Sequence, residues 1–138
     1  MATPFLDTNI FLRHLCQDEP VLSPKATALL ERIEQGELAV RTSDIVIFET
    51  VFTLQRSYKH PRDRIAAALL PLIELPGIVL PGKRAYRRVF ELYTGGGLGF
   101  ADCYHVVLME RLGIREVVSF DRDFDAMAGI ERIDLVDV

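Results

Sequence analysis

The sequence predicts an α/β protein in which a short, mostly parallel central sheet is covered by helices on both faces. Short apolar segments alternate along the chain with longer segments that carry helix signals. The short segments are apolar at successive positions, which is typical of strands buried on both faces. No repeat, low-complexity segment or linker divides the 138 residues. We therefore expect one domain spanning residues 1–138, close to the commonest domain size.

Helices are expected wherever start and stop signals enclose a longer segment. The expected helices are residues 8–16, 23–36, 43–58, 61–70, 83–93, 100–112 and 122–127. Ser23 with Pro24 begins the second helix and Gly36 ends it. Residues 43–58 contain β-branched residues that also suit a strand, but their length and Ser43 as a cap favour a helix. Pro71 is expected to break the helix that begins at residue 61.

Strands are expected in the short apolar segments between these helices. They are residues 3–6, 38–42, 77–80, 116–120 and 132–136. In open parallel sheets ligands bind beyond the carboxyl ends of the strands. The residues that directly follow each strand are therefore the place to look for chemistry.

The composition restricts what the protein can bind without a metal ion. The chain is 49% hydrophobic and has a formal charge of −4, which argues against bulk electrostatic attraction to nucleic acid. Cys16 and Cys103 form no C-x-x-C motif and are expected to be reduced thiols. The first residues do not resemble a signal peptide, and prolines interrupt the most apolar stretch, residues 65–81. We expect a soluble, cytoplasmic protein with no membrane contact.

Several acidic residues lie where such a sheet binds its ligands. Asp7 follows the first expected strand, and Asp121 follows the strand at 116–120. Asp102 lies in the first turn of a nearly apolar helix. Each also has a simpler explanation, because Asp caps helices, favours turns and is stabilised at helix N-termini. Asp123 competes with Asp121, and Ser119 is placed to orient either carboxylate.

Glu49 stands alone in the apolar stretch IVIFETVFTL, residues 45–54. A lone buried carboxylate is costly and normally becomes protonated. One explanation is a surface position, with Arg56 two turns further on. However, its helical neighbours are Ile45, Phe52 and Thr53, so we expect a face that is not solvated. We interpret Glu49 as facing a metal site rather than the core.

Taken together, the four acids predict a metal site. Asp7 and Asp121 should emerge at one edge of the sheet, with Asp102 and Glu49 within reach of that edge. Carboxylates that converge in one crevice cannot all stay ionised without cations. Carboxylate oxygens suit Mg²⁺ or Mn²⁺, and no set of Cys and His residues offers a zinc site.

These motifs resemble a known family. FLDTN with Asp7, the isolated Glu49, FADCYH with Asp102 and SFDRDF with Asp121 resemble the PIN domain, in particular VapC-type toxin ribonucleases. The order and spacing of the acids fit, and the resemblance covers essentially the whole chain.

The resemblance implies a fold, an activity and partners. It implies a three-layer α/β/α, Rossmann-like PIN fold and a metal-dependent endoribonuclease that hydrolyses RNA phosphodiester bonds. It further implies a toxin of a VapBC-like toxin–antitoxin pair, inhibited by a VapB-like antitoxin and commonly a homodimer. By residue matching, Asp7 and Asp102 would be the main ligands of Mg²⁺ or Mn²⁺, completed by Glu49 and Asp121. Thr8, Asn9 and Ser119 match supporting polar positions.

Other residues carry weaker signals. The basic stretches at residues 56–64 and 83–90 contain Tyr58 and Tyr86, and they suit either RNA contact or a solvated helix face. His105 lies one turn from Asp102, but a helical histidine is more often packed or solvent-facing, so it is not assigned as a base.

Two other functions compete with the ribonuclease. A haloacid-dehalogenase-like phosphohydrolase would use Asp7 as a nucleophile, but such enzymes typically carry a second Asp where this chain has Asn9. A non-catalytic PIN module would bind RNA or a protein without metal-dependent turnover. The complete set of four acids argues against a degenerate site.

Overall fold

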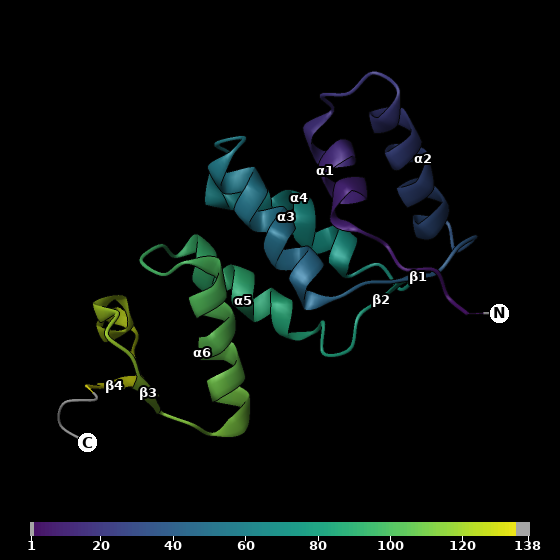
Figure 1. The fold of residues 1–138 in the computed structure, drawn as a ribbon. Coiled ribbons are helices and arrows are strands. Elements are labelled where there is room, and N and C mark those ends of the chain that lie inside the picture. Colours follow the sequence, from purple (N-terminus) through teal and green to yellow (C-terminus); the bar gives the residue numbers. More distant parts are fainter. Residues whose placement is uncertain (1, 135–138) are drawn as a thin grey trace. The chain divides into compact units, whose positions relative to one another are not determined.

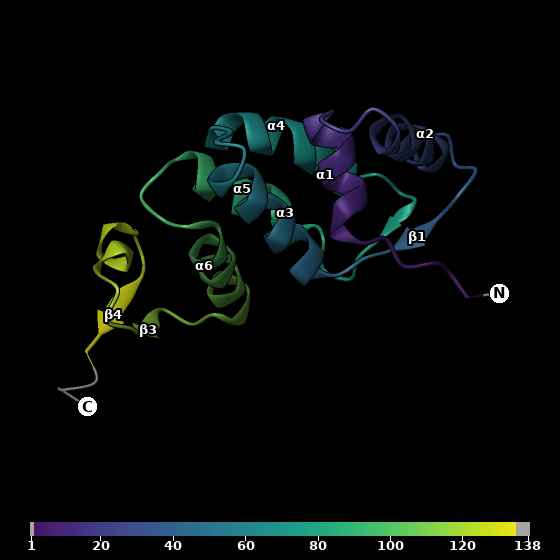
Figure 2. The same cartoon turned by 45° about the horizontal axis from the view of Figure 1, so that its top comes forward.

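The structure is a computed structural model that describes residues 2–134. The chain divides into two compact units, Met1–Arg84 and Ala85–Val138, called here the N-terminal and C-terminal units. Figures 1 and 2 show the elements of both units. Each unit is described by itself, and the expectation of one domain over residues 1–138 stays a prediction.

The N-terminal unit combines helices with one pair of parallel strands. Its elements are α1 (Thr8–Cys16), α2 (Leu22–Glu34), β1 (Val40–Arg41), α3 (Asp44–Arg56), α4 (Arg62–Ile73) and β2 (Ile78–Val79). In the sheet Val40 pairs with Ile78, and Phe5 adds an isolated parallel bridge to Arg41. Helix α1 packs against both α2 and α3.

Apolar side chains from every helix form the core of this unit. Phe11 of α1, Ile47 of α3 and Ile65 of α4 are all completely inaccessible to solvent. Burial of each such side chain stabilises the fold by about 1.5–3 kcal/mol. This core fixes α1 against α3. The two expected acids of this unit lie on these helices, Asp7 at the N-cap of α1 and Glu49 within α3.

The C-terminal unit has an aromatic core and a second pair of strands. Its elements are α5 (Ala85–Thr94), α6 (Phe100–Leu112), β3 (Glu116–Val118), the 3₁₀ helix η1 (Arg122–Ala126) and β4 (Glu131–Ile133). Helices α5 and α6 lie side by side, and β3 pairs in parallel with β4 (Figures 1 and 2). Rings of both helices pack together, and the Phe90 and Phe100 centroids are 5.0 Å apart.

The α/β character and the parallel strand pairing agree with the sequence prediction. The helix expected at residues 43–58 is α3, and Ser43 caps it by accepting a hydrogen bond from the Val46 N–H at 3.3 Å. The helix expected at residues 100–112 is α6, with the same bounds. None of the helices in the described part of the chain has the length and apolar composition needed to cross a membrane.

Three local expectations are wrong. Helix α4 does not break at Pro71 but continues to Ile73, because Pro71 lies in its last turn and Leu69 and Ile73 on either side are fully buried. Residues 3–6 make one bridge instead of a strand, since Pro4 has no N–H to donate. The strand expected at 116–120 ends at Val118. Part of the strand expected at 132–136 lies outside the described residues.

Candidate active site

Asp7 lies where residue 6 leaves the sheet and α1 begins. The Leu6 N–H donates to the Arg41 carbonyl at 2.7 Å, and the buried Thr42 hydroxyl donates to the Leu6 carbonyl at 3.0 Å. These bonds fix the backbone directly before Asp7. Its Oδ1 accepts a hydrogen bond from the Thr8 N–H at 2.8 Å and caps α1, and the residue is exposed. Capping uses one of about four acceptor sites on a carboxylate, so a cap can also bind a cation.

Glu49 is exposed on α3 and is tied to α1. The buried Thr8 hydroxyl donates to Glu49 Oε2 at 3.0 Å. Ile45 and Phe52 beside it are 68% and 58% exposed, so the expectation that this face is not solvated is wrong. Burial of α3 falls instead on the opposite face, which includes Val46 and Val51. Glu49 is thus outside the core, as expected, and its contact with a metal stays a prediction.

Asp102 occupies the first turn of α6, whose N-cap is Gly99. Its side chain is 29% exposed, and His105 Nδ1 lies 3.9 Å from its Oδ1. Burial raises the pKa of Asp102, and the negative charge of Asp121 raises that pKa further. His105 opposes this shift in the pKa, and Asp123 adds a smaller increase. The ionised form of Asp102 is therefore disfavoured, and a nearby cation would stabilise it.

Asp121 follows β3 and caps the 3₁₀ helix η1. Its Oδ1 accepts from the Asp123 N–H at 2.9 Å. Ser119 does not orient either carboxylate: its hydroxyl oxygen accepts from the Asp121 backbone N–H at 3.0 Å. The order of the two effects on the Asp102 pKa favours Asp121 over Asp123 as its acidic neighbour.

The structure thus groups the four acids as two pairs. Thr8 connects Asp7 to Glu49 in the N-terminal unit, and Asp102 experiences the charge of Asp121 in the C-terminal unit. Within neither unit do three or more His, Cys, Asp or Glu side chains, among residues 2–134, gather closely enough to hold a metal ion. Convergence of all four acids on one metal stays a prediction.

Comparison with known proteins identifies the family. The family model described as the PIN domain matches residues 5–130. The chain belongs to the PIN domain family. It is also 31% identical over 121 residues to a VapC ribonuclease of Aquifex aeolicus, an alignment that covers 86% of this chain and 87% of that protein. Both findings confirm the resemblance that the motifs around the four acids indicated.

One similar solved structure is VapC20 of Mycobacterium tuberculosis, a toxin that cleaves the sarcin–ricin loop. It is 22% identical to this PIN domain protein, the alignment covers 94% of this chain and 98% of that one, and the TM-score is 0.40. The family assignment rests on the family model and on the Aquifex relative.

The two tyrosines in the basic stretches differ in their surroundings: Tyr86 is buried, whereas Tyr58 is partly exposed and its hydroxyl has hydrogen-bond partners. Tyr86 is 1% exposed and packs among the rings of the C-terminal unit, so it cannot stack on an RNA base. The Tyr58 hydroxyl donates to Asp18 Oδ2 at 2.7 Å and accepts from Arg13 Nη2 at 3.2 Å. Lys83, in the second basic stretch, donates to the carbonyls of Leu75 and Ile78.

The network of Arg13, Asp18 and Tyr58 is a feature that sequence reasoning missed. Arg13 and Asp18 also form an ion pair at 3.2 Å, so three side chains join the end of α1 to the residues after α3. No spacing rule connects residues 40 or more positions apart. The only sequence signal was one tyrosine among basic residues.

Proposed function

We propose that this protein is a metal-dependent endoribonuclease that hydrolyses RNA phosphodiester bonds. Membership of the PIN family and the similarity to a VapC ribonuclease support a ribonuclease. The observation that carries the metal dependence is the half-buried Asp102, whose pKa is raised by burial and by the charge of Asp121. Such a pair favours binding of a cation, which relieves its repulsion.

The residues present fit Mg²⁺ or Mn²⁺. The donors are carboxylate oxygens, which are hard ligands suited to these ions. We propose Asp7, Glu49, Asp102 and Asp121 as both the ligands and the catalytic acids. The chemistry that such an ion would supply, if these residues held it, is activation of a water molecule and neutralisation of charge on the phosphate.

The chain's own side chains have separate tasks in this reaction. The Thr8 hydroxyl holds Glu49 in one orientation, and capping holds the carboxylates of Asp7 and Asp121. These three carboxylates therefore keep their positions before substrate arrives, which lowers the cost of organising the site. A carboxylate of the set that borders the attacked phosphate accepts the proton of the water.

We also propose the biological setting that the resemblance implies. The protein would be the toxin of a VapBC-like pair, act in the cytoplasm, form a homodimer and be inhibited by a VapB-like antitoxin. Support for this setting comes from the similarity to a VapC ribonuclease. Co-expression with the product of a neighbouring small gene would test it: that protein should co-purify and abolish cleavage.

A substrate comparison tests the proposed activity. Purified protein is incubated with structured RNA, with single-stranded DNA and with a small phosphate ester, each in Mn²⁺, in Mg²⁺ and with EDTA. Cleavage of RNA that requires metal supports the proposal. Release of phosphate from the small ester instead would indicate the phosphohydrolase, and RNA binding with no turnover would indicate a non-catalytic module.

A further inference from the structure

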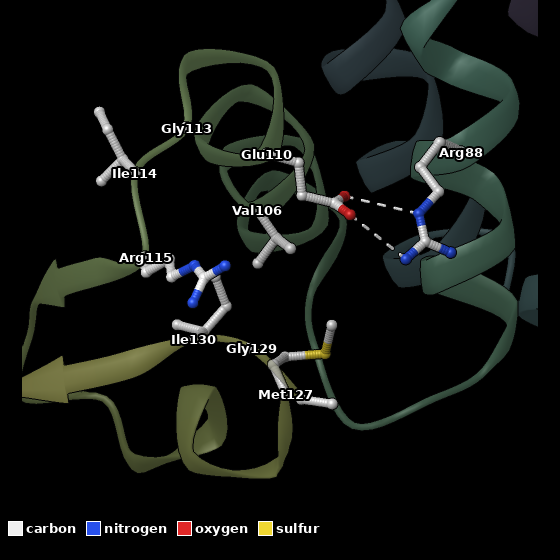
Figure 3. Close-up of a pocket in the computed structure, with 10 residues that line it drawn as sticks. Arg88, Val106, Glu110, Gly113, Ile114, Arg115, Met127, Gly129 and Ile130 are labelled. Carbon is white, nitrogen blue, oxygen red and sulfur yellow. Dashed lines mark hydrogen bonds and ion pairs between the residues drawn. The ribbon is translucent and has the colours of Figure 1, made fainter.

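One pocket lies within the C-terminal unit, and its lining includes none of the four candidate acids. It has a volume of about 360 Å³ and is lined from α5, from the end of α6 and from the loop between η1 and β4. Small-ligand sites usually measure about 300–1,000 Å³, so this one suits a ligand at the small end of that range. Figure 3 shows its labelled side chains.

Two guanidinium groups border this pocket. Arg88 on α5 forms ion pairs with Glu91 at 3.1 Å and with Glu110 on α6 at 3.5 Å (Figure 3). Arg115 precedes β3, and over residues 2–134 its side chain has neither an ion pair nor a hydrogen-bond partner. Guanidinium groups bind phosphate through paired N–H donors. Arg115 is therefore the group ready to bind an anion, and Arg88 is held nearby by carboxylates.

Besides Arg88, Arg115 and the Glu110 carboxylate that pairs with Arg88, the lining is apolar or lacks a side chain. Val106, Met127 and Ile130 supply carbon and sulfur surface. Gly113 and Gly129 have φ of 71° and 84°, a conformation that favours glycine, and a Cβ at either position would meet nothing within 4 Å. The space beside them is open. A flat, weakly polar ring fits such a wall, and methionine sulfur contacts aromatic rings favourably.

We propose that this pocket binds one unpaired nucleotide of the RNA substrate, with its phosphate on Arg115 and its base against Met127 and Ile130. An anion joined to a flat ring matches the two kinds of lining, and unstacked bases are what proteins read in single-stranded RNA. The lining residues of α6, Val106 and Glu110, lie four and eight residues after Asp102, which is about 6 Å and 12 Å along the helix. In this proposal the nucleotide in the pocket is a neighbour of the one cleaved.

This inference rests on the proposed ribonuclease function, because that function supplies RNA as the ligand. Measuring RNA binding under conditions without cleavage tests the pocket separately from the ribonuclease activity. Affinity for a fluorescent single-stranded RNA is measured in EDTA for wild type, Arg115→Ala, Arg115→Lys and the control Arg111→Ala. Arg111 is an exposed arginine in the last turn of α6, outside the pocket lining, so its loss changes the net charge equally. Unfolding midpoints confirm that all four proteins are folded.

The expected result is about tenfold weaker RNA binding for Arg115→Ala, as for loss of one charged hydrogen bond. Arg115→Lys should recover part of the affinity, and Arg111→Ala should change it less than twofold. If Arg115→Ala and Arg111→Ala weaken RNA binding equally, the pocket is not a nucleotide site, even if metal-dependent RNA cleavage is intact.

A second arm identifies the source of the nucleotide. AMP and UMP at millimolar concentration are added to the same proteins, and binding is followed by NMR shifts. Weak binding that requires Arg115, together with the RNA effect, supports the proposal. Mononucleotide binding that requires Arg115 while RNA affinity is unchanged would overturn the assignment to RNA.

Discussion

The two acid pairs of this PIN domain are positioned by different means. In the N-terminal unit, Glu49 is exposed and accepts a hydrogen bond from the neutral Thr8 hydroxyl. In the C-terminal unit, Asp102 is half-buried and faces the like charge of Asp121, which raises its pKa. In the first pair a hydrogen-bond donor orients the carboxylate. In the second pair two carboxylates repel each other, and a bound cation would relieve that repulsion. We therefore expect the C-terminal pair to respond more strongly to a metal ion than the N-terminal pair.

The largest expected effect is that of Asp102→Asn. Loss of a metal-ligand carboxylate should reduce RNA cleavage by more than about a hundredfold, since even partners outside the ligand set cost 10–100-fold. The free energy of unfolding of the metal-free protein should stay level or rise, because repulsion from Asp121 is removed. Cleavage rates and urea unfolding check both parts. A large loss of stability would show that the strained-pair description is wrong.

A smaller loss of activity is expected from Glu49→Gln. The amide oxygen still accepts the Thr8 hydroxyl, so the fold should persist while the charge is lost. Cleavage should fall by about 10–100-fold. Glu34→Gln, an exposed position at the end of α2, is the matched control and should leave cleavage unchanged. If Glu49→Gln keeps full activity, Glu49 is not part of the active site.

Metal binding should raise the melting temperature by several degrees. Any ligand that binds only the folded state stabilises it, by about 2.7 kcal/mol at a concentration one hundred times the dissociation constant. Mn²⁺ or Mg²⁺ at millimolar concentration should shift the wild-type melting curve in scanning calorimetry. Asp102→Asn should show little shift, and a shift equal to that of wild type would locate the metal elsewhere.

The smallest expected effects concern pH and differ in sign between the units. Burial lowers the pKa of His14, whose Nδ1 lies 2.8 Å from the Thr27 hydroxyl oxygen. Charging it costs stability, so its contribution is lost as the pH falls below about 6.5. The raised pKa of Asp102 has the opposite consequence: its contribution is present at low pH and is lost as the pH rises through the folded-state pKa.

Urea unfolding of His14→Gln and Asp102→Asn across this pH range measures the two contributions. Compared with wild type, His14→Gln should lose less stability on acidification, and Asp102→Asn should gain less. The quantity to compare is the difference in the free energy of unfolding between wild type and each variant, plotted against pH. If this difference changes with pH in the same direction for both variants, the contrast between the units is contradicted.

The sequence predicts the helices of this protein better than its strands. Helix α6 matches because Gly113 ends it in a left-handed conformation that local sequence signals well. The strands pair over only two or three residues, and their ends depend on partners that are distant in sequence. Helix α4 continues past Pro71 because packing of Ile73 outweighs the lost hydrogen bond, an effect that local sequence does not show.

For the candidate site, the sequence indicates which acidic residues are candidates, but it does not show which side chains surround them. Asp7 comes shortly after the bridge at Phe5, and Asp121 comes shortly after β3, the positions where parallel α/β sheets carry their ligand-binding residues. Tertiary packing sets the exposure of Phe52 beside Glu49 and the burial of Tyr86. The Ser119 hydroxyl accepts a hydrogen bond from the Asp121 N–H, which its place in the sequence also leaves open. Periodicity alone does not specify which apolar face of a helix is covered.

We propose that both acid pairs take part in metal-dependent cleavage of RNA. The most direct measurement is the rate of RNA cleavage in Mn²⁺, with an EDTA control, for wild type, Asp7→Asn, Asp102→Asn and the double variant. If both acids are needed for the same reaction step, each single substitution should abolish most of the activity and the double variant should lose little more, because such groups act as a unit. Losses that add independently, or full activity in either single variant, would contradict the claim.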